Sequence, residues 1–382
     1  MKKVLIQTCF INNYGACLQA YALQSVINNF HNTKSYIIPF DRYPDLNLNF
    51  SRKVRRLLKL VKYFRKPIYY QVIDDIKFER AFNFFRKKYL LFYKVHKLTR
   101  DKKFFLSLNY DCKYFVCGSD IIWNPNLKKD NLWYDMLGFC KDNSIRIAYA
   151  PSFGISVFPN DLIPECSQYL FKFNYLSCRE DSGVKIIRDQ FQLNSEHVLD
   201  PTLLLTNTQW KNLCLGVKPN KKNKYCFIYM FSKMPIKEIV DKILFDTDLD
   251  IEIIPFGNVD ESLFNDRVHK NKSNTGPLEF VSLISNAKLV IANSLHALAF
   301  SINLNTPFII FNRDNYDPNY SINSRLTSML NMFNFSDRLI DINTFLNGNI
   351  YSYLEQNFIL SNKILKENRI KCVAYLKDAL DV

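Results

Sequence analysis

One histidine of this sequence stands in a setting that suits proton transfer. His296 follows the apolar run 289–292 and opens a helical pattern that extends to about residue 304. Asn293 and Ser294, just before it, are good N-cap residues. A helix N-terminus offers unpaired N–H groups and partial positive charge to a phosphate or carboxylate, and an imidazole beside such an anion can act as an acid or a base. The competing interpretation is a histidine that only hydrogen-bonds to a neighbouring loop.

An arginine occupies a similar setting. Arg179 ends the strand-like stretch 174–179 and precedes a helical pattern. A guanidinium group at a strand end can hold a carboxylate or phosphate through two parallel hydrogen bonds. The alternative is a structural salt bridge with Glu180 or Asp181.

A loop near the N-terminus is a third candidate. In NNYGACLQAYALQ, the loop 12–16 precedes a helix predicted over 16–30, and Gly15 allows a ligand to approach the backbone closely. Asn13 and Tyr14 complete this predicted substrate-binding loop. The other glycines of a G-x-G-x-x-G fingerprint and the lysine of a P-loop are missing.

The stretch CGSDIIWNP (117–125) follows another predicted strand and carries Asp120 and Trp123. An aromatic ring that stacks on a sugar, with polar groups that bond its hydroxyls, is a common sugar-binding arrangement. Asp120 and Trp123 are therefore candidate acceptor-binding residues. A capped turn with a buried tryptophan explains the pattern equally well.

The elements that must position these residues alternate between apolar strand-like runs and helical stretches, which predicts an α/β protein with mostly parallel sheets. A polar, lysine-rich segment divides them into two series. We expect an N-terminal domain over 1–205, with a basic helical insertion at about 52–108, and a C-terminal domain over 206–354. The last helix, 355–380, is expected to reach back to the first domain. Two doubly wound, Rossmann-like domains that face a cleft would bind a ligand between them.

The net charge of +15 over 382 residues indicates an anionic partner. Residues 51–71 contain eight Lys or Arg and no acidic residue. A helix over 52–66 would be amphipathic, which suits an anionic membrane surface or a solvated surface helix. The N-terminal apolar run meets polar residues too early for a signal peptide, and no run is long enough to cross a bilayer, so a cytoplasmic protein is expected.

The ten cysteines include no C-x-x-C pair, and several lie in apolar strands. They are expected to be buried and reduced, and no cluster of residues demands a metal. Familiar motifs of RNA- and DNA-binding proteins are missing, which argues against nucleic acid as the partner.

Seven segments between residues 12 and 311 carry a family resemblance when taken in order: NNYGACLQAYALQ, CGSDIIWNP, AYAPSFG, LSCREDSG, VLDPTLLL, PLEFVSLISNAKLVIANSLHALAFSI and TPFIIF. Together they resemble the polysaccharide pyruvyl transferase family. The resemblance implies a two-domain fold like that of GT-B glycosyltransferases. It also implies transfer of a pyruvyl group from phosphoenolpyruvate, a co-substrate, to a hexose of a surface polysaccharide (capsule or exopolysaccharide) or of its lipid-linked precursor. The usual product is a cyclic ketal, and no cofactor is implied.

By this resemblance, His296 is the general acid that protonates the methylene carbon of the donor. Arg179 binds the charge of the donor, assisted by backbone groups of Ser294 and Leu295. A lipid-linked acceptor would bring the protein to the inner membrane face, where segment 52–66 could dock.

The chain departs from the family pattern at two positions. Some members have an arginine where Ser294 stands, so Arg325 or Lys233 is a candidate replacement for that charge. Many relatives have a glutamine at the position of Ile121, which leaves acceptor specificity open.

Two other classes of function stay open. A GT-B glycosyltransferase with a nucleotide-sugar donor would use the same cleft and the same helix N-terminus. A non-catalytic anion- or nucleic-acid-binding protein is suggested only by the charge.

Overall fold

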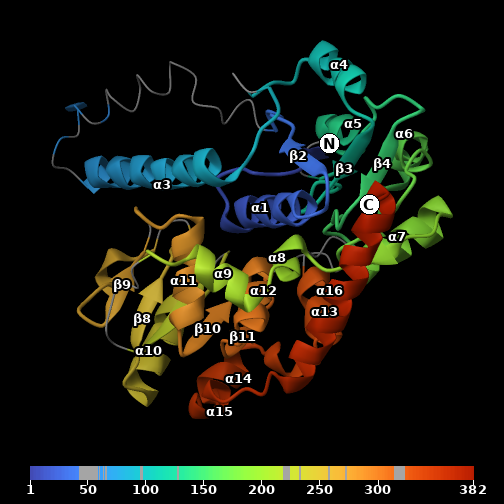
Figure 1. Ribbon diagram of the computed structural model, residues 1–382. Helices are drawn as coiled ribbons and strands as arrows, with labels where there is room; N and C mark the ends of the chain where they lie inside the picture. Colours follow the sequence, from blue (N-terminus) through green and yellow to red (C-terminus); the bar gives the residue numbers. More distant parts are fainter. Residues whose placement is uncertain are drawn as a thin grey trace.

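The computed structural model describes residues 1–42, 59, 61–62, 64, 67–94, 98–126, 129–217, 224–231, 234–256, 259–271, 273–313 and 323–382. Most of the basic segment 52–66, and also Lys233, lie outside the described residues. The chain forms two α/β units, one above the other in Figure 1.

The N-terminal unit is built on a parallel sheet with the strand order β2-β1-β3-β4. Short apolar runs form these strands because helices cover the sheet and bury it. The chain goes from β1 to β2 at one edge and returns to the other side of β1, so the loops after β1 and β3 lie at a topological switch point. The strands are β1 (Lys2–Gln7), β2 (Thr33–Ile37), β3 (Tyr114–Cys117) and β4 (Ile145–Ala148).

Helices and one small strand pair complete this unit. Strands β5 (Ser177–Cys178) and β6 (Glu196–His197) form a separate parallel pair outside the main sheet. The helices are α1 (Tyr14–Asn28), α3 (Pro67–Tyr89), α4 (Lys102–Asp111), α5 (Leu132–Asp135), α6 (Ile163–Leu170) and α7 (Asp181–Phe191). The predicted insertion 52–108 contains α3 and most of α4.

The C-terminal unit has a second parallel sheet with the order β11-β10-β7-β8-β9. The chain leaves β7 toward β8 and later returns to its other side at β10, which creates a second switch point at the ends of β7 and β10. The strands are β7 (Tyr225–Tyr229), β8 (Asp250–Ile253), β9 (Val268–Lys270), β10 (Leu289–Ala292) and β11 (Phe308–Ile310).

Helices of the second half surround this sheet and connect it to the first. Short helices α8 (Pro201–Leu204) and α9 (Asn207–Leu213) form the passage between the units. The others are α10 (Ile236–Asp246), α11 (Pro277–Asn286), α12 (Leu295–Leu304), α13 (Ser324–Met332), α14 (Ile342–Asn347), α15 (Tyr351–Leu354) and α16 (Ile359–Leu380).

The two units pack directly on each other where α1 meets α11. The ring of Tyr14, at the start of α1, stacks on Phe280 of α11 with 4.6 Å between centroids and 6° between planes. Its hydroxyl donates to the carbonyl oxygen of Thr275 at 3.1 Å. The interface is therefore partly a hydrophobic core shared by the two units.

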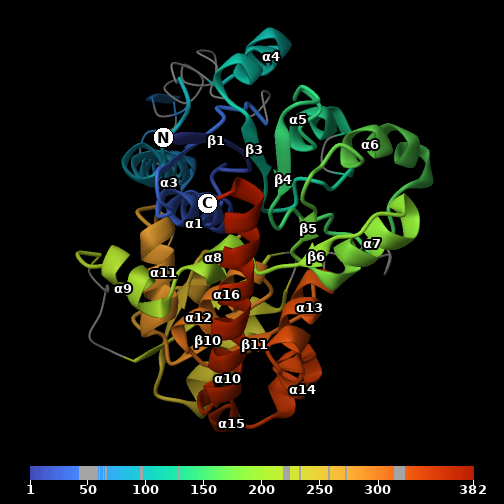
Figure 2. The same ribbon diagram turned by 45° about the vertical axis from the view of Figure 1, so that its right-hand side comes forward.

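The last helix crosses from the second unit to the first (Figure 2). On α16, the Arg369 guanidinium donates to the carbonyl oxygen of Leu203 at 2.6 Å, and the Tyr375 hydroxyl donates to the carbonyl oxygen of Ala148 in β4 at 2.9 Å. The helix thus bonds to both the passage between the units and the first sheet.

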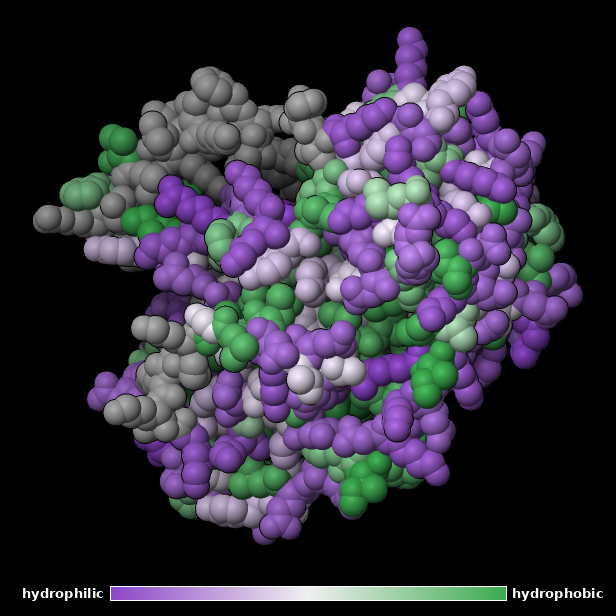
Figure 3. Space-filling view, in the orientation of Figure 1, coloured by the Kyte–Doolittle hydropathy of each residue, from purple (hydrophilic) through white to green (hydrophobic). Residues whose placement is uncertain are grey.

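The predicted fold class is confirmed, since the strands of both main sheets pair in parallel and helices alternate with them along the chain. All ten cysteines are free, and all but Cys214 are buried. Among the described residues, no helix has the length and apolar character to cross a membrane. The face seen in Figure 3 is mostly hydrophilic, with small hydrophobic patches.

Candidate active site

A cavity of about 160 Å³ lies between the two units, where both switch points meet. The first unit contributes Asn13 from the loop after β1, Gly15 from the first turn of α1 and Asp120 from the loop after β3. The second contributes Ser294 and His296 from the start of α12. Three arginines, Arg42, Arg313 and Arg325, also line this space. The cavity thus combines helix N-termini from both units with several cationic side chains.

Helix α12 brings His296 to the cavity. Its N-cap is Ser294, whose hydroxyl accepts from the N–H of Ala297 at 3.5 Å. Leu295 and His296 are the first two helical residues, so their N–H groups have no partner within the helix and can serve an anion. The predicted strand–turn–helix arrangement around His296 is therefore confirmed.

Gly15 accommodates the ring of His296. The nearest atom to a Cβ built at this glycine is His296 Nδ1, at only 1.9 Å. No other residue leaves this space, because any side chain begins with a Cβ. The helix starts earlier than predicted, at Tyr14, because the Asn13 side chain accepts from the N–H of Ala16 at 3.1 Å. Gly15 is therefore in the first turn of α1, pressed against the imidazole.

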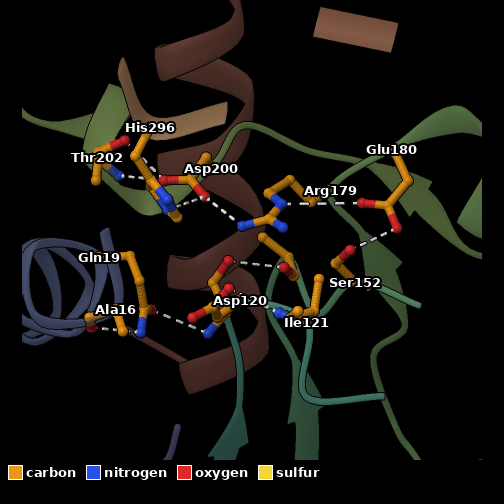
Figure 4. Close-up of polar contacts among 12 residues, drawn as sticks. Ala16, Gln19, Asp120, Ile121, Ser152, Arg179, Glu180, Asp200, Thr202 and His296 are labelled. Atoms are coloured by element: carbon orange, nitrogen blue, oxygen red, sulfur yellow. Dashed lines mark hydrogen bonds and ion pairs between the residues drawn. The ribbon is translucent and has the colours of Figure 1, made fainter. Parts of the chain in front are cut away.

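Asp200 faces the other nitrogen of this imidazole (Figure 4). Its Oδ2 lies 3.5 Å from His296 Nε2 and 2.8 Å from Arg179 Nη1. Its Oδ1 accepts from the N–H of Thr202 at 2.9 Å and from the Thr202 hydroxyl at 2.7 Å. Burial alone would raise the pKa of this carboxyl, but His296, Arg179 and Thr202 outweigh burial and hold the pKa well below its usual range. Asp200 is thus a buried anion beside the histidine.

Arg179 lies behind Asp200 and does not line the cavity. Its side chain is 1% exposed, and its Nε lies 3.8 Å from Glu180 Oε2. Among the described residues, its Nε and Nη2 have no hydrogen-bond partner. The salt-bridge alternative considered for this arginine is therefore present, with Asp200 as the closer carboxylate. Arg179 and His296 are nevertheless brought together, because both contact the same Asp200 oxygen.

Of the three arginines that line the cavity, Arg42 is ion-paired with the buried Asp135, and the other two are Arg313 and Arg325. Arg313 donates from Nε to the carbonyl oxygen of Asn293 at 2.9 Å and lies over the Phe231 ring, 4.3 Å from its centroid. Burial lowers the pKa of Arg313 to about 10. Burial, together with Arg179 and Arg313, lowers the pKa of Arg325 to about 9. A negative charge beside these two arginines would stabilise their protonated forms and raise both pKa values again.

Asp120 lines the same cavity from the first unit. Its backbone has a φ of 71°, a left-handed conformation that aspartate tolerates better than most residues. One carboxylate oxygen accepts from the N–H of Ile121 at 2.9 Å. Asn13, Gly15, Asp120 and Ile121 thus form the wall that faces α12.

Two predicted acceptor-binding residues, Trp123 and Tyr14, are not among the residues that line the cavity. Trp123 is completely buried against Phe153 and Phe173, so it offers no open face to a sugar, and the predicted stacking role is wrong. Tyr14 is also buried, because its ring packs in the interface between the units. Both aromatic rings stabilise the structure around the cavity.

Sequence reasoning did not identify Asp200 or Arg313 as site residues. Asp200 lies in the VLDP segment, where it also caps the short helix α8. That pattern alone indicates a cap, and the contact with His296 depends on residues about a hundred positions apart. Arg313 lies in the loop after β11, which ends at Ile310, and this position at the carboxyl end of a strand could have pointed to it.

The fold defines a class: two Rossmann-like domains with a cavity between them, as in GT-B proteins. The solved structure of a UDP-GlcNAc 2-epimerase from Methanocaldococcus jannaschii shares this fold, with a TM-score of 0.50 at 13% identity over 96% of this chain and 99% of that chain. The rhamnosyltransferase SpnG is similar at a TM-score of 0.49 and 10% identity over the whole of both chains. No protein of curated function matches the chain in sequence.

The sequence model of polysaccharide pyruvyl transferases matches residues 13–315. The chain belongs to this family of transferases that act on polysaccharides. The match begins at the Asn13 cap of α1 and ends just after Arg313, so it spans both walls of the cavity.

Proposed function

We propose that this protein transfers a pyruvyl group from phosphoenolpyruvate to a hexose of a surface polysaccharide or of its lipid-linked precursor, and releases phosphate. The observation that carries this proposal is a small cationic cavity with His296 at a helix N-terminus. Family membership supports the same reaction class. The product would be a cyclic pyruvate ketal.

The donor would bind by its two anionic groups. Arg313 and Arg325, which line the cavity, would pair with the phosphate and the carboxylate. The N–H groups at the start of α12, including that of Leu295, would add hydrogen bonds, with Ser294 as the cap. Arg313 would also supply the charge that some family members place at the position of Ser294. Arg179 would contribute its charge from behind Asp200.

The reaction would begin with His296. A protonated imidazole gives its proton to the methylene carbon, which becomes a methyl group, and C2 becomes electrophilic. An acceptor hydroxyl attacks C2, and Asp120 takes its proton. Phosphate then leaves with its bonding electrons, and a second hydroxyl of the same hexose closes the ketal. The second hydroxyl gives its proton to His296, and the proton held by Asp120 passes to phosphate, so the two hydroxyl protons account for the one gained by the methyl group and the one gained by phosphate.

The acceptor would enter from the first unit, beside Asn13, Gly15 and Asp120. If it is lipid-linked, the protein would work at the cytoplasmic face of a membrane. The basic segment 52–66 would then bind anionic lipid. Sedimentation with liposomes at low salt tests this binding, because equal recovery with neutral and anionic vesicles would remove the idea.

A nucleotide-sugar glycosyltransferase is the second candidate, since the epimerase from Methanocaldococcus jannaschii, which shares this fold, was solved in complex with UDP-GlcNAc and UDP. The cavity of about 160 Å³ favours the smaller donor. It is well below the roughly 300–1,000 Å³ of pockets that enclose drug-sized ligands, and a nucleotide sugar is a ligand of that size.

Turnover distinguishes the two. Purified protein is incubated with lipid-linked glycans and either phosphoenolpyruvate or a UDP-sugar, in D₂O. We expect phosphate release only with phosphoenolpyruvate, and a product whose pyruvyl methyl group carries one deuterium. Release of UDP, without phosphate release from phosphoenolpyruvate, would establish the glycosyltransferase instead.

A further inference from the structure

Asp200 is more extensively engaged than a residue that only caps a helix. One of its oxygens accepts both bonds from Thr202, and the other faces Arg179 and His296 together. Its side chain is fully buried, so it has no surface left for a substrate. Any effect of Asp200 on the reaction must therefore pass through one of these neighbours.

Within the part of the chain that the structure describes, Asp200 is the carboxylate recorded beside His296 Nε2. Among the described residues this nitrogen is buried without a hydrogen bond, and the Asp200 oxygen at 3.5 Å is just outside hydrogen-bonding geometry. Contacts of this kind are often long without substrate and shorten in the reactive complex. Gly15 lies over the face of the ring, because a Cβ built at this glycine would meet Nδ1, Cγ and Cε1 at 1.9, 2.2 and 2.4 Å, and both Gly15 and His296 line the cavity.

We propose that Asp200 is a positioning residue that holds a proton on His296 Nε2 and thereby makes Nδ1 the atom that exchanges protons with substrate. Arg179 and Thr202 keep the carboxylate in place and ionised. The catalytic consequence rests on the proposed function, whereas the hydrogen-bond geometry does not. The other charged groups that line the cavity are Arg42, Arg313, Arg325 and Asp120.

The direct test is the tautomer of His296, followed by nitrogen-15 NMR of the full chain with its resonances assigned by comparison with His296→Ala. We expect a proton on Nε2 in the natural sequence at a pH where the ring is neutral. Asp200→Asn can offer an N–H in place of an acceptor, so it should move the proton to Nδ1. An Nδ1–H tautomer in the natural sequence, or the same tautomer in both proteins, overturns the proposal.

Kinetics with phosphoenolpyruvate give the second readout. We expect Asp200→Asn to lower kcat by about 10- to 1,000-fold, with KM for the donor within about threefold, as for an aspartate that orients a catalytic histidine. Asp250→Asn is the matched control, since Asp250 is also buried and lies 3.7 Å from Arg267, away from the cavity. An equal loss in both variants would indicate a merely structural role and overturn the proposal.

A milder variant covers the case in which Asp200→Asn does not fold. Thr202→Val keeps the backbone bond to Asp200 and removes only the hydroxyl bond of 2.7 Å. We expect a smaller fall in kcat, about three- to tenfold, again without a change in KM. An unchanged kcat would count against the proposal. If no preparation turns over phosphoenolpyruvate but the tautomer depends on Asp200, the proposed function fails and the pairing stands.

Discussion

At the scale of single residues, the proposed chemistry depends on how His296 is held between Gly15 and Asp200. The imidazole touches a helix start of the other unit on one side and a buried carboxylate on the other. A proton donor needs such fixed geometry as well as a suitable side chain. The sequence predicted the histidine and its helix, but it did not show which residues would hold the ring.

His296→Ala should remove the proposed proton donor and leave the binding site for phosphoenolpyruvate intact. We expect kcat with phosphoenolpyruvate to fall by about 100- to 10,000-fold with little change in KM. His31→Ala is the control, because His31 is exposed at the end of α1, away from the cavity. Turnover close to that of the natural sequence in His296→Ala would remove the proposed role.

Gly15→Ala should destabilise the fold through the histidine alone. The added methyl group would meet His296 Nδ1 at 1.9 Å, and overpacking of this kind costs about 1–3 kcal/mol. In the His296→Ala background the same change should be neutral or slightly stabilising, because alanine favours a helix over glycine. Denaturant unfolding of the four proteins measures the coupling. Additive effects would show that Gly15 and His296 do not interact.

Asp200 should make stability sensitive to acid. Because the folded-state pKa of Asp200 is below that of the unfolded chain, its stabilising contribution is present above a pH of about 4 and is lost as pH falls from there toward the folded-state value. We expect Asp200→Asn to cost about 3–5 kcal/mol at neutral pH. The difference from the natural sequence should narrow below pH ~4. A difference that is constant with pH would contradict the lowered pKa.

At the scale of elements, the two switch points determine where the site forms. The alternation of strands and helices predicted the parallel sheets, and with them the loops that meet at the cavity. It did not predict which side chains of those loops face inward. Trp123 and Tyr14 are residue types that often bind sugars, yet both are buried. An aromatic ring in such a loop can pack into the protein core as readily as it can stack on a sugar.

The contact between α1 and α11 should depend on Tyr14 mainly through its ring. Tyr14→Phe removes only the hydrogen bond to Thr275, at a cost of about 0.5–1.5 kcal/mol. Tyr14→Ala also removes the stack on Phe280 and should cost about 3–5 kcal/mol. Chemical denaturation gives both values. Equal losses would mean that the ring stacking adds nothing to the interface.

At the scale of the whole molecule, the site exists only because both units contribute to it. Helix α16 returns to the first sheet, and α1 packs on α11, so the cavity has walls from both halves of the chain. The family and the fold class could be predicted from the order of motifs. Arg313 and Asp200 could not be assigned, because the contact of Arg313 with Asn293 and those of Asp200 with Arg179 and His296 form only in the fold.

The central claim is that this cavity binds phosphoenolpyruvate, and calorimetric titration of the full chain tests it without any acceptor. We expect saturable binding of phosphoenolpyruvate and none of UDP-GlcNAc. Arg325→Ala or Arg313→Ala should weaken donor binding by at least about tenfold, as for the loss of a charged hydrogen bond. Arg188→Ala, which removes a surface arginine paired with Asp189, should leave it unchanged. Binding of UDP-GlcNAc together with no binding of phosphoenolpyruvate would contradict the proposed donor.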